Sequence, residues 1–258
     1  MEHEPLSLNQ PHVEVLDWEN LTELHFEDRP APPALLQKAD GLTLRPFSLM
    51  RSKVQQKLKE QDVTLIGVTS ATPNAGKSTL SIALAASLEK VSDRPVVLAD
   101  LDLRRASIAE YLGLEVGYGL SDYLEDPSIG LQSVAVKIAN TGLVVLPTRA
   151  KTSGTAELLA GAAMENLAAS LKAMERKPIC VFDLPPAFAN DDTMIALESL
   201  DGYFLIVESG ETSKRHLLDV LKILAPAKCY GTILNRYEGT IGDSYSYGSS
   251  IYSRYYEE

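Results

Sequence analysis

Short apolar runs alternate along the chain with longer stretches whose apolar residues recur at helical spacing. The apolar runs have the length of buried strands and cover 63–68, 96–99, 143–146, 179–182, 203–207 and 230–234. The stretches with helical spacing cover 44–58, 78–90, 106–112, 155–174, 192–200 and 213–224. Nearly continuous apolar strands separated by helices predict a parallel sheet covered on both faces. We therefore expect a doubly wound, mainly parallel α/β fold, in which ligands bind at the carboxyl ends of the strands.

Both ends of the chain lack this alternation. Residues 1–42 are acidic and contain five prolines, so they predict a poorly ordered, extended N-terminal arm. Residues 237–258 hold six of the eleven tyrosines among glycine, serine and acidic residues. Such a segment buries too little apolar area to fold alone and predicts a flexible tail. The folded domain is expected to cover residues 43–236.

Charge and cysteine content narrow the class of protein. The net charge is −11, and residues 1–40 carry −7 of it, with nine acidic and two basic residues. An acidic chain without a basic patch argues against a nucleic-acid partner. Cys180 and Cys229 lack a CxxC spacing and fit reduced core cysteines. Because no signal pattern or spanning apolar run is present, we expect a cytoplasmic protein whose membrane attachment comes from a partner.

A candidate phosphate-binding loop follows the first apolar run. Residues 70–79 read Ser-Ala-Thr-Pro-Asn-Ala-Gly-Lys-Ser-Thr, which nearly matches G-x-x-x-x-G-K-[ST], with Ala71 at the first glycine. A strand-to-helix turn directs backbone N–H groups and a helix N-terminus at a phosphate. Alanine fits this turn only if its φ stays negative. Lys77 is expected to reach the phosphates and Ser78 to bind Mg²⁺. The residues expected around the nucleotide are Thr72, Pro73, Asn74, Ala75, Gly76, Lys77, Ser78 and Thr79.

Carboxylates follow two more of the predicted strands. Asp100 and Asp102 end the run at 96–99, and alternate residues project the same way while Leu101 turns into the core. Asp183 ends the run at 179–182 and is followed by Leu-Pro-Pro. The first pattern alone is equally typical of a charged loop, and the second alone is a weak signal. Beside a phosphate loop, these carboxylates suit Mg²⁺ binding and acceptance of a proton from an attacking hydroxyl.

The order of these motifs resembles the bacterial tyrosine kinases of polysaccharide export, a branch of the deviant phosphate-loop (Walker A) ATPases that includes septum-site and plasmid-partitioning ATPases. The resemblance covers about residues 45–256. Besides 70–79, it is carried by Asp-Leu-Asp-Leu-Arg-Arg at 100–105, Leu-Gly-Leu at 112–114, Gly-Leu-Ser-Asp-Tyr-Leu at 119–124, Leu-Pro-Thr at 146–148, Ala-Glu-Leu-Leu at 156–159, Asp-Leu-Pro-Pro at 183–186 and Leu-Asn-Arg at 234–236. The family has the P-loop NTPase fold, which agrees with the predicted α/β sheet.

The resemblance implies a tyrosine kinase that uses ATP and Mg²⁺. Its catalytic residues would be Lys77, Asp100, Asp102 and Asp183. Ser78 and the three aspartates would hold the metal, one of Asp100 and Asp102 would accept the tyrosine proton, and Asn235 would lie near the adenine. The phosphate acceptors would be the tail tyrosines Tyr245, Tyr247, Tyr252, Tyr255 and Tyr256.

The implied partners follow from the same resemblance. The kinase would regulate exopolysaccharide or capsule polymerisation and export, and a separate transmembrane activator or polysaccharide co-polymerase would recruit it to the inner face of the membrane. A tyrosine phosphatase and further copies of the chain are the other implied partners.

Two departures leave alternatives open. Thr72 stands where partitioning ATPases carry a lysine that reaches across a dimer, a lysine that the kinase branch generally also lacks. The family's oligomerisation motif Glu-x-x-Arg-x-x-Arg corresponds to 45–51, which keeps only the final Arg51, so the oligomeric state stays open. The degraded motif and Ala71 favour a second hypothesis, a nucleotide-switched ATPase scaffold of the same pathway that transfers no phosphate to tyrosine.

Overall fold

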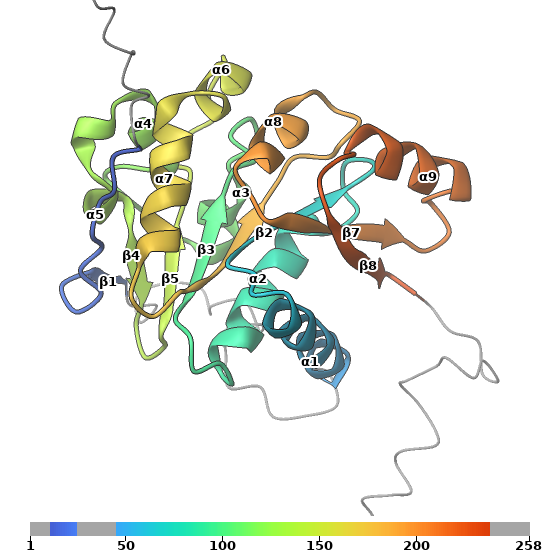
Figure 1. Ribbon diagram of the computed structural model, residues 1–258, viewed down its shortest axis with the longest axis horizontal. Coiled ribbons are helices and arrows are strands. Elements are labelled where there is room, and N and C mark those ends of the chain that lie inside the picture. Colours follow the sequence, from blue (N-terminus) through green and yellow to red (C-terminus); the bar gives the residue numbers. More distant parts are fainter. Residues whose placement is uncertain (1–10, 25–44, 238–258) are drawn as a thin grey trace, which may run out of the picture.

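An eight-stranded sheet forms the centre of the protein in the computed structural model, which describes residues 11–24 and 45–237 (Figure 1). The strand order is β1-β4-β5-β3-β6-β2-β7-β8. The strands are β1 (Thr22–Leu24), β2 (Leu65–Ser70), β3 (Val96–Asp100), β4 (Val136–Ile138), β5 (Leu143–Leu146), β6 (Ile179–Asp183), β7 (Gly202–Glu208) and β8 (Cys229–Asn235). Among these strands only β4 and β5 pair antiparallel. The predicted doubly wound, mainly parallel fold is therefore confirmed.

Helices cover both faces of this sheet. They are α1 (Arg45–Glu60), α2 (Lys77–Glu89), α3 (Ser107–Leu112), α4 (Leu120–Glu125), the 3₁₀ helix η2 (Pro127–Ile129), α5 (Leu131–Val134), α6 (Thr155–Leu159), α7 (Ala162–Ala173), α8 (Asp192–Glu198) and α9 (Lys214–Ile223). Helices α1 to α3 pack in one apolar cluster, whereas α4 to α9 pack in a second cluster (Figure 1). The central strands are buried because both of their faces meet helices, which explains their continuous apolar sequence. None of the helices in the described part of the chain is long and apolar enough to span a membrane.

The stretch expected to form one helix over 155–174 forms two. Helix α6 ends at Leu159, and α7 begins only after Gly161, whose φ of −79° and ψ of 160° are extended. Gly161 also has little room for a side chain, because an added Cβ would lie 3.3 Å from the carbonyl oxygens of Glu157 and Leu158. A glycine that ends a turn of helix therefore divides this stretch.

Part of the acidic N-terminal arm packs against the domain, so the expectation of poor order is wrong for residues 11–24. Strand β1 pairs in parallel with β4, and Leu16 and Leu21 are buried. Glu14 is bound on three sides: its N–H donates to Ser170 Oγ at 2.8 Å, and its carboxylate accepts from Tyr123 Oη at 2.9 Å and from the N–H of Leu131 at 2.7 Å. Burial, followed by the hydrogen bond to Glu14, raises the pKa of Tyr123 well above its usual value. The domain thus begins earlier than residue 43.

Candidate active site

The predicted phosphate loop joins β2 to α2, as expected. Ala71 is buried and its φ is not positive, so alanine at the first glycine position introduces no backbone strain. The left-handed residues of the loop are instead Asn74, with φ of 65°, and Gly76, with φ of 87°. Asparagine and glycine are the residues that adopt this conformation most readily. Alanine in place of the first glycine of the motif therefore does not weaken the loop through backbone strain.

Asn235 lies against the phosphate loop at the end of β8. Its Nδ2 donates a hydrogen bond of 2.8 Å to the carbonyl oxygen of Ala75. A Cβ added to Gly76 would lie 2.3 Å from the same Nδ2. The contact between the Asn235 amide and the loop therefore requires glycine at position 76. It brings Asn235 to the border of the phosphate site, although 160 positions of sequence separate Asn235 from Ala75.

The carboxylates predicted at two strand ends meet in the structure. Strands β3 and β6 are neighbours, and Asp100 pairs in register with Asp183. Both side chains are fully buried. Asp183 accepts hydrogen bonds from Ser78 Oγ at 2.5 Å and from Ser81 Oγ at 3.0 Å. The loop serine is therefore held on the carboxylate of β6.

Asp100 and Asp102 have different surroundings. Asp100 accepts backbone hydrogen bonds from Ile108 at 3.0 Å and from Asp102 at 3.1 Å. Asp102 lies with its Oδ2 3.9 Å from Lys77 Nζ, and the two side chains are only 5% and 3% exposed. Leu101 between them is buried in the core, as the alternation predicted. Asp102 therefore faces the phosphate loop, whereas Asp100 is enclosed by backbone.

The carboxylate cluster carries excess negative charge in a buried place. Burial, followed by the charge of Asp183, raises the pKa of Asp100 well above its usual value. Burial also raises the pKa of Asp183 to about 6, although Lys77 and the hydrogen bond from Ser78 oppose this. Burial also raises the pKa of Asp102 above its usual value, and the charge of Lys77 opposes this shift most strongly. Three buried carboxylates with a single lysine ammonium, which lies beside Asp102, fit a site that gains a divalent cation.

The donor set fits Mg²⁺ held jointly with phosphate. Among residues 11–24 and 45–237, no group of three or more His, Cys, Asp or Glu side chains is arranged to hold a metal by itself. Mg²⁺ at phosphoryl-transfer sites takes one or two protein ligands and completes its octahedron with phosphate oxygens and water. The hydroxyl of Ser78 and the neighbouring carboxylates supply that smaller number of ligands.

A cavity of about 220 Å³ opens over the N-terminus of α2 and contains side chains that the sequence reasoning did not assign. From the predicted loop, Asn74, Gly76, Lys77, Ser78 and Thr79 line the cavity, whereas Thr72, Pro73 and Ala75 do not. The unassigned residues are Arg105, Tyr111 and Arg236.

The two arginines at the cavity each contact a neighbouring side chain. Arg105 Nη1 donates to Asn74 Oδ1 at 3.1 Å, and Arg236 pairs with Glu208. Two arginines at the phosphate loop increase its attraction for anions. Both lie inside motifs that carry the family resemblance, Arg105 in Asp-Leu-Asp-Leu-Arg-Arg at 100–105 and Arg236 in Leu-Asn-Arg at 234–236, and these motifs were the available signal.

A buried carboxylate joins the two strand-end loops. Arg104 Nε donates to Asp192 Oδ2 at 2.8 Å, and Asp192 is only 1% exposed. The same carboxylate accepts from Thr155 Oγ1 at 2.8 Å and from Asn190 Nδ2 at 2.9 Å. The loop after β3 is therefore fixed to the loop after β6 and to the start of α6, so Asp192 positions the segment that carries Asp102.

Comparisons with known proteins agree with this geometry, although no family model matches the chain. The tyrosine-protein kinase YwqD of Bacillus subtilis is 30% identical over 198 residues, which are 76% of this chain and 81% of YwqD. The tyrosine-protein kinase ptk of Acinetobacter johnsonii is 28% identical over 79% of this chain and 28% of its own length. The chain thus spans about a quarter of that longer relative but most of YwqD.

The structure is also similar to a solved kinase domain. The VpsO kinase domain superposes with a TM-score of 0.67 at 26% identity, covering 76% of this chain and 98% of that domain. Together with the phosphate loop, the buried strand-end aspartates and the likeness to YwqD, this shows that the chain belongs to the bacterial tyrosine-protein kinases of the P-loop ATPase superfamily.

Proposed function

We propose that the chain transfers the γ-phosphoryl group of ATP to tyrosine hydroxyls, including those of its own C-terminal cluster. The observation that carries this proposal is the convergence of Lys77, Ser78 and the three strand-end aspartates at the N-terminus of α2. Positioning and charge stabilisation are what phosphoryl transfer requires from a protein. The kinase family of the chain supports the same reaction.

Each residue of the cluster has a proposed role. Lys77 binds the β- and γ-phosphates. Its ammonium group, which lies 3.9 Å from Asp102 Oδ2 in the structure, then contacts the nucleotide instead. Ser78, assisted by Asp183 and Asp100, holds Mg²⁺, which neutralises charge on the phosphate oxygens when bound. The phosphate-loop residues and Asn235 complete the nucleotide site, and the proposed role of Asn235, which donates a hydrogen bond to the loop at Ala75, is contact with the adenine.

Asp102 is the proposed base for the tyrosine hydroxyl. Asp100 is fully enclosed and already accepts two backbone hydrogen bonds, so it has no path to an incoming substrate. Asp102 retains 4% exposure and faces Lys77. Burial raises the pKa of its carboxyl, which suits a proton acceptor, and Lys77 opposes this shift. A base must reach the proton that it accepts, and Asp102 meets this condition better.

The tail is the proposed substrate. Its acceptors Tyr245, Tyr247, Tyr252, Tyr255 and Tyr256 lie outside the described residues. Delivery by a second copy of the chain is consistent with Arg51 in α1, whose buried Nε has no hydrogen-bond partner in the described structure. Each added phosphate contributes about −1.5 to −2 charges, and the resulting repulsion favours release of a partner or a neighbouring copy.

The proposal extends to the pathway that the sequence resemblance implies. A separate transmembrane activator, or polysaccharide co-polymerase, recruits the kinase to the inner face of the membrane. Cycles of tail phosphorylation and removal of phosphate by a tyrosine phosphatase then regulate polymerisation and export of an exopolysaccharide or capsule.

Phosphosite mapping tests the proposal. The full chain is incubated with ATP and Mg²⁺, digested and examined by mass spectrometry beside the Lys77→Met and Asp100→Asn variants. We expect several phosphotyrosines within residues 245–256 in the parent chain and far fewer in both variants. An unmodified tail in the parent chain would contradict autophosphorylation.

A further inference from the structure

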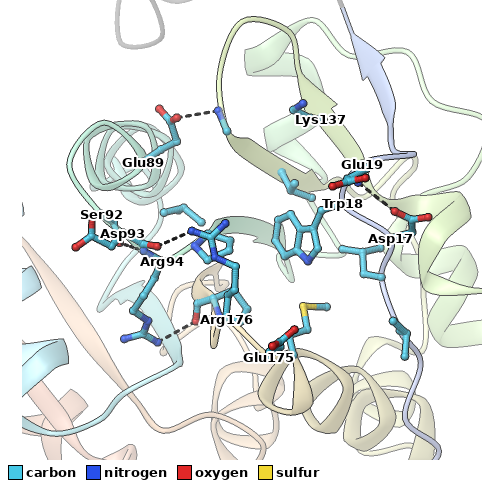
Figure 2. A pocket seen from close by; sticks show the side chains of 18 residues that line it. Asp17, Trp18, Glu19, Glu89, Ser92, Asp93, Arg94, Lys137, Glu175 and Arg176 are labelled. Carbon is cyan, nitrogen blue, oxygen red and sulfur yellow. Dashed lines mark hydrogen bonds between the residues drawn. The ribbon is translucent and has the colours of Figure 1, made fainter.

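A second cavity lies at the amino ends of the central strands, whereas the nucleotide site lies at their carboxyl ends. Figure 2 shows the side chains that line this cavity. It encloses about 790 Å³ beside the amino ends of β3, β5 and β6, where its lining includes Val96, Gly142 and Pro178. The N-terminal arm supplies the wall formed by residues 15–19. Because strands β3 and β6 carry the active-site aspartates at their other ends, an occupant here would leave the nucleotide site free.

The chain's single tryptophan forms one side of this cavity. Trp18 is partly buried and packs against the main apolar cluster. Figure 2 shows its indole ring facing the cavity from the side opposite Asp93 and Arg94. Val144 and Met174 add apolar surface to the lining. An aromatic face with aliphatic neighbours offers a place for an apolar or cationic side chain.

The basic side chains that line the cavity already bind other groups of the domain. Arg94 donates from Nε to the carbonyl oxygen of Lys177 at 2.6 Å and from Nη2 to two further carbonyl oxygens at 3.0 Å. Arg176 donates to the carbonyl oxygen of Asp93 at 2.9 Å, and Lys137 pairs with a glutamate of β1 at 2.8 Å. These three groups hold the walls together, so the cavity offers little attraction for an anionic ligand.

Three of the carboxylates at the cavity, by contrast, have no partner among the described residues. Five acidic residues line it against three basic ones: Asp17, Glu19, Glu89, Asp93 and Glu175. Asp17 accepts hydrogen bonds within the arm, and Glu89 accepts one from the N–H of Gly142 at 2.7 Å. The side chains of Glu19, Asp93 and Glu175 are exposed and make no hydrogen bond or ion pair to any residue that the structure describes. The unsatisfied charge of the cavity is therefore negative.

We propose that this cavity docks a segment of a partner polypeptide in which lysine or arginine side chains flank an apolar one. The apolar side chain enters beside Trp18, and the flanking cations meet the carboxylates of Glu19 and Glu175. Charge complementarity and the aromatic wall favour this occupant over a nucleotide, phosphopeptide or other anion. The cavity volume lies in the range of sites that bind a compact ligand or a few side chains of a peptide.

Trp18 itself provides the signal for the test. The full chain is titrated with the peptide acetyl-Gly-Arg-Leu-Arg-Met-Arg-Gly-amide, and the tryptophan emission is followed with excitation that avoids tyrosine. Because the peptide has no tryptophan and the chain has one, any emission change comes from Trp18. We expect a saturable change that weakens with added salt and is absent with a matched peptide containing glutamine in place of arginine. Calorimetry with the Trp18→Ala variant, which should bind more weakly, checks the result without fluorescence.

Paired charge variants identify the carboxylates. The double variant Glu19→Gln with Glu175→Gln should bind the arginine peptide about five-fold more weakly, since each exposed ion pair contributes little. The double variant Glu125→Gln with Glu198→Gln removes the same charge elsewhere on the surface and should bind like the parent chain. Equal binding of the glutamine peptide, equal losses in the two double variants, or no saturable binding would overturn the proposal. Arginine amide binding as tightly as the peptide would also overturn it, because the cavity would then be a site for a small cation.

Discussion

Replacing Lys77 by methionine removes the ammonium group that faces the buried carboxylate of Asp102 and also attracts that of Asp183. Lys77 Nζ lies 3.9 Å from Asp102 Oδ2, and both side chains are at most 5% exposed. Two unit charges at this distance attract each other by about 4 kcal/mol at an effective dielectric constant of about 20. Removing one partner of a buried pair destabilises a protein by about 3 to 5 kcal/mol, because the remaining charge stays desolvated. We expect a loss of about 3 kcal/mol at neutral pH in the absence of nucleotide.

The pH dependence of this loss distinguishes charge from packing. The folded-state pKa of Asp183 is raised to about 6, so this group takes up a proton in the folded state before it does so in the unfolded state. Stability without ligand therefore increases as the pH falls from above 6 toward 4. Without Lys77 the carboxylates bind protons at still higher pH. The difference between variant and parent chain should then shrink on acidification, by at most about 1.4 kcal/mol per pH unit for each extra proton.

Thermal and urea unfolding at several pH values measure this effect. A loss of about 3 kcal/mol corresponds to a decrease of about 6 to 12 °C in Tm for a domain of this size. Lys53→Met removes an exposed lysine of α1 and serves as the matched control, with little expected change. A Lys77→Met variant as stable as the parent chain at neutral pH, or a loss that stays constant down to pH 5, would refute the electrostatic reasoning.

Three further predictions concern the chemistry and the packing. The kcat/KM for ATP should rise with pH up to about 6 and then level off, because Asp183 must lose its proton to assist metal binding; a profile that is flat through pH 6 would contradict this role. Gly119→Ala should lower stability by about 1 to 3 kcal/mol in urea unfolding, because its Cβ would lie 2.3 Å from a backbone nitrogen, whereas Gly117→Ala, with open space around it, should not. Glu14→Ala should speed amide hydrogen exchange at Leu131, which loses its acceptor; unchanged exchange would show that the arm is held by other contacts.

The sheet was predictable where its strands are buried on both faces. Strands β2, β3, β5, β6 and β7 read as apolar runs because helices cover them on both sides. Strands β1 and β4 have three residues each, include exposed or half-exposed polar residues, and pair at the edge of the sheet. No periodicity distinguishes such a segment from a loop. The packing of the arm was unpredictable for a similar reason, since it depends on the pairing of Glu14 with residues more than 100 positions away.

The active site was predictable only as far as the strand-end rule reaches. That rule brings Asp100, Asp183 and the phosphate loop to one edge of the sheet, and the structure places them together. Contacts between loops leave no regular spacing in the sequence from which they could be predicted. The pair of Arg104 with Asp192 joins residues 88 positions apart, and the contact of Arg105 with Asn74 spans 31. Their partners depend on loop conformations that only the folded chain defines.

The central claim, transfer of phosphate to tyrosine, is tested most directly by following where the γ-phosphate of ATP goes. The full chain is supplied with ATP labelled at this phosphate and with Mg²⁺, and phosphotyrosine and free phosphate are quantified against the ADP formed. The account predicts that early phosphotyrosine matches the ADP and that both disappear in the Lys77→Met variant. ADP accompanied by free phosphate alone, without phosphotyrosine, would contradict the account and identify a nucleotide-switched ATPase scaffold.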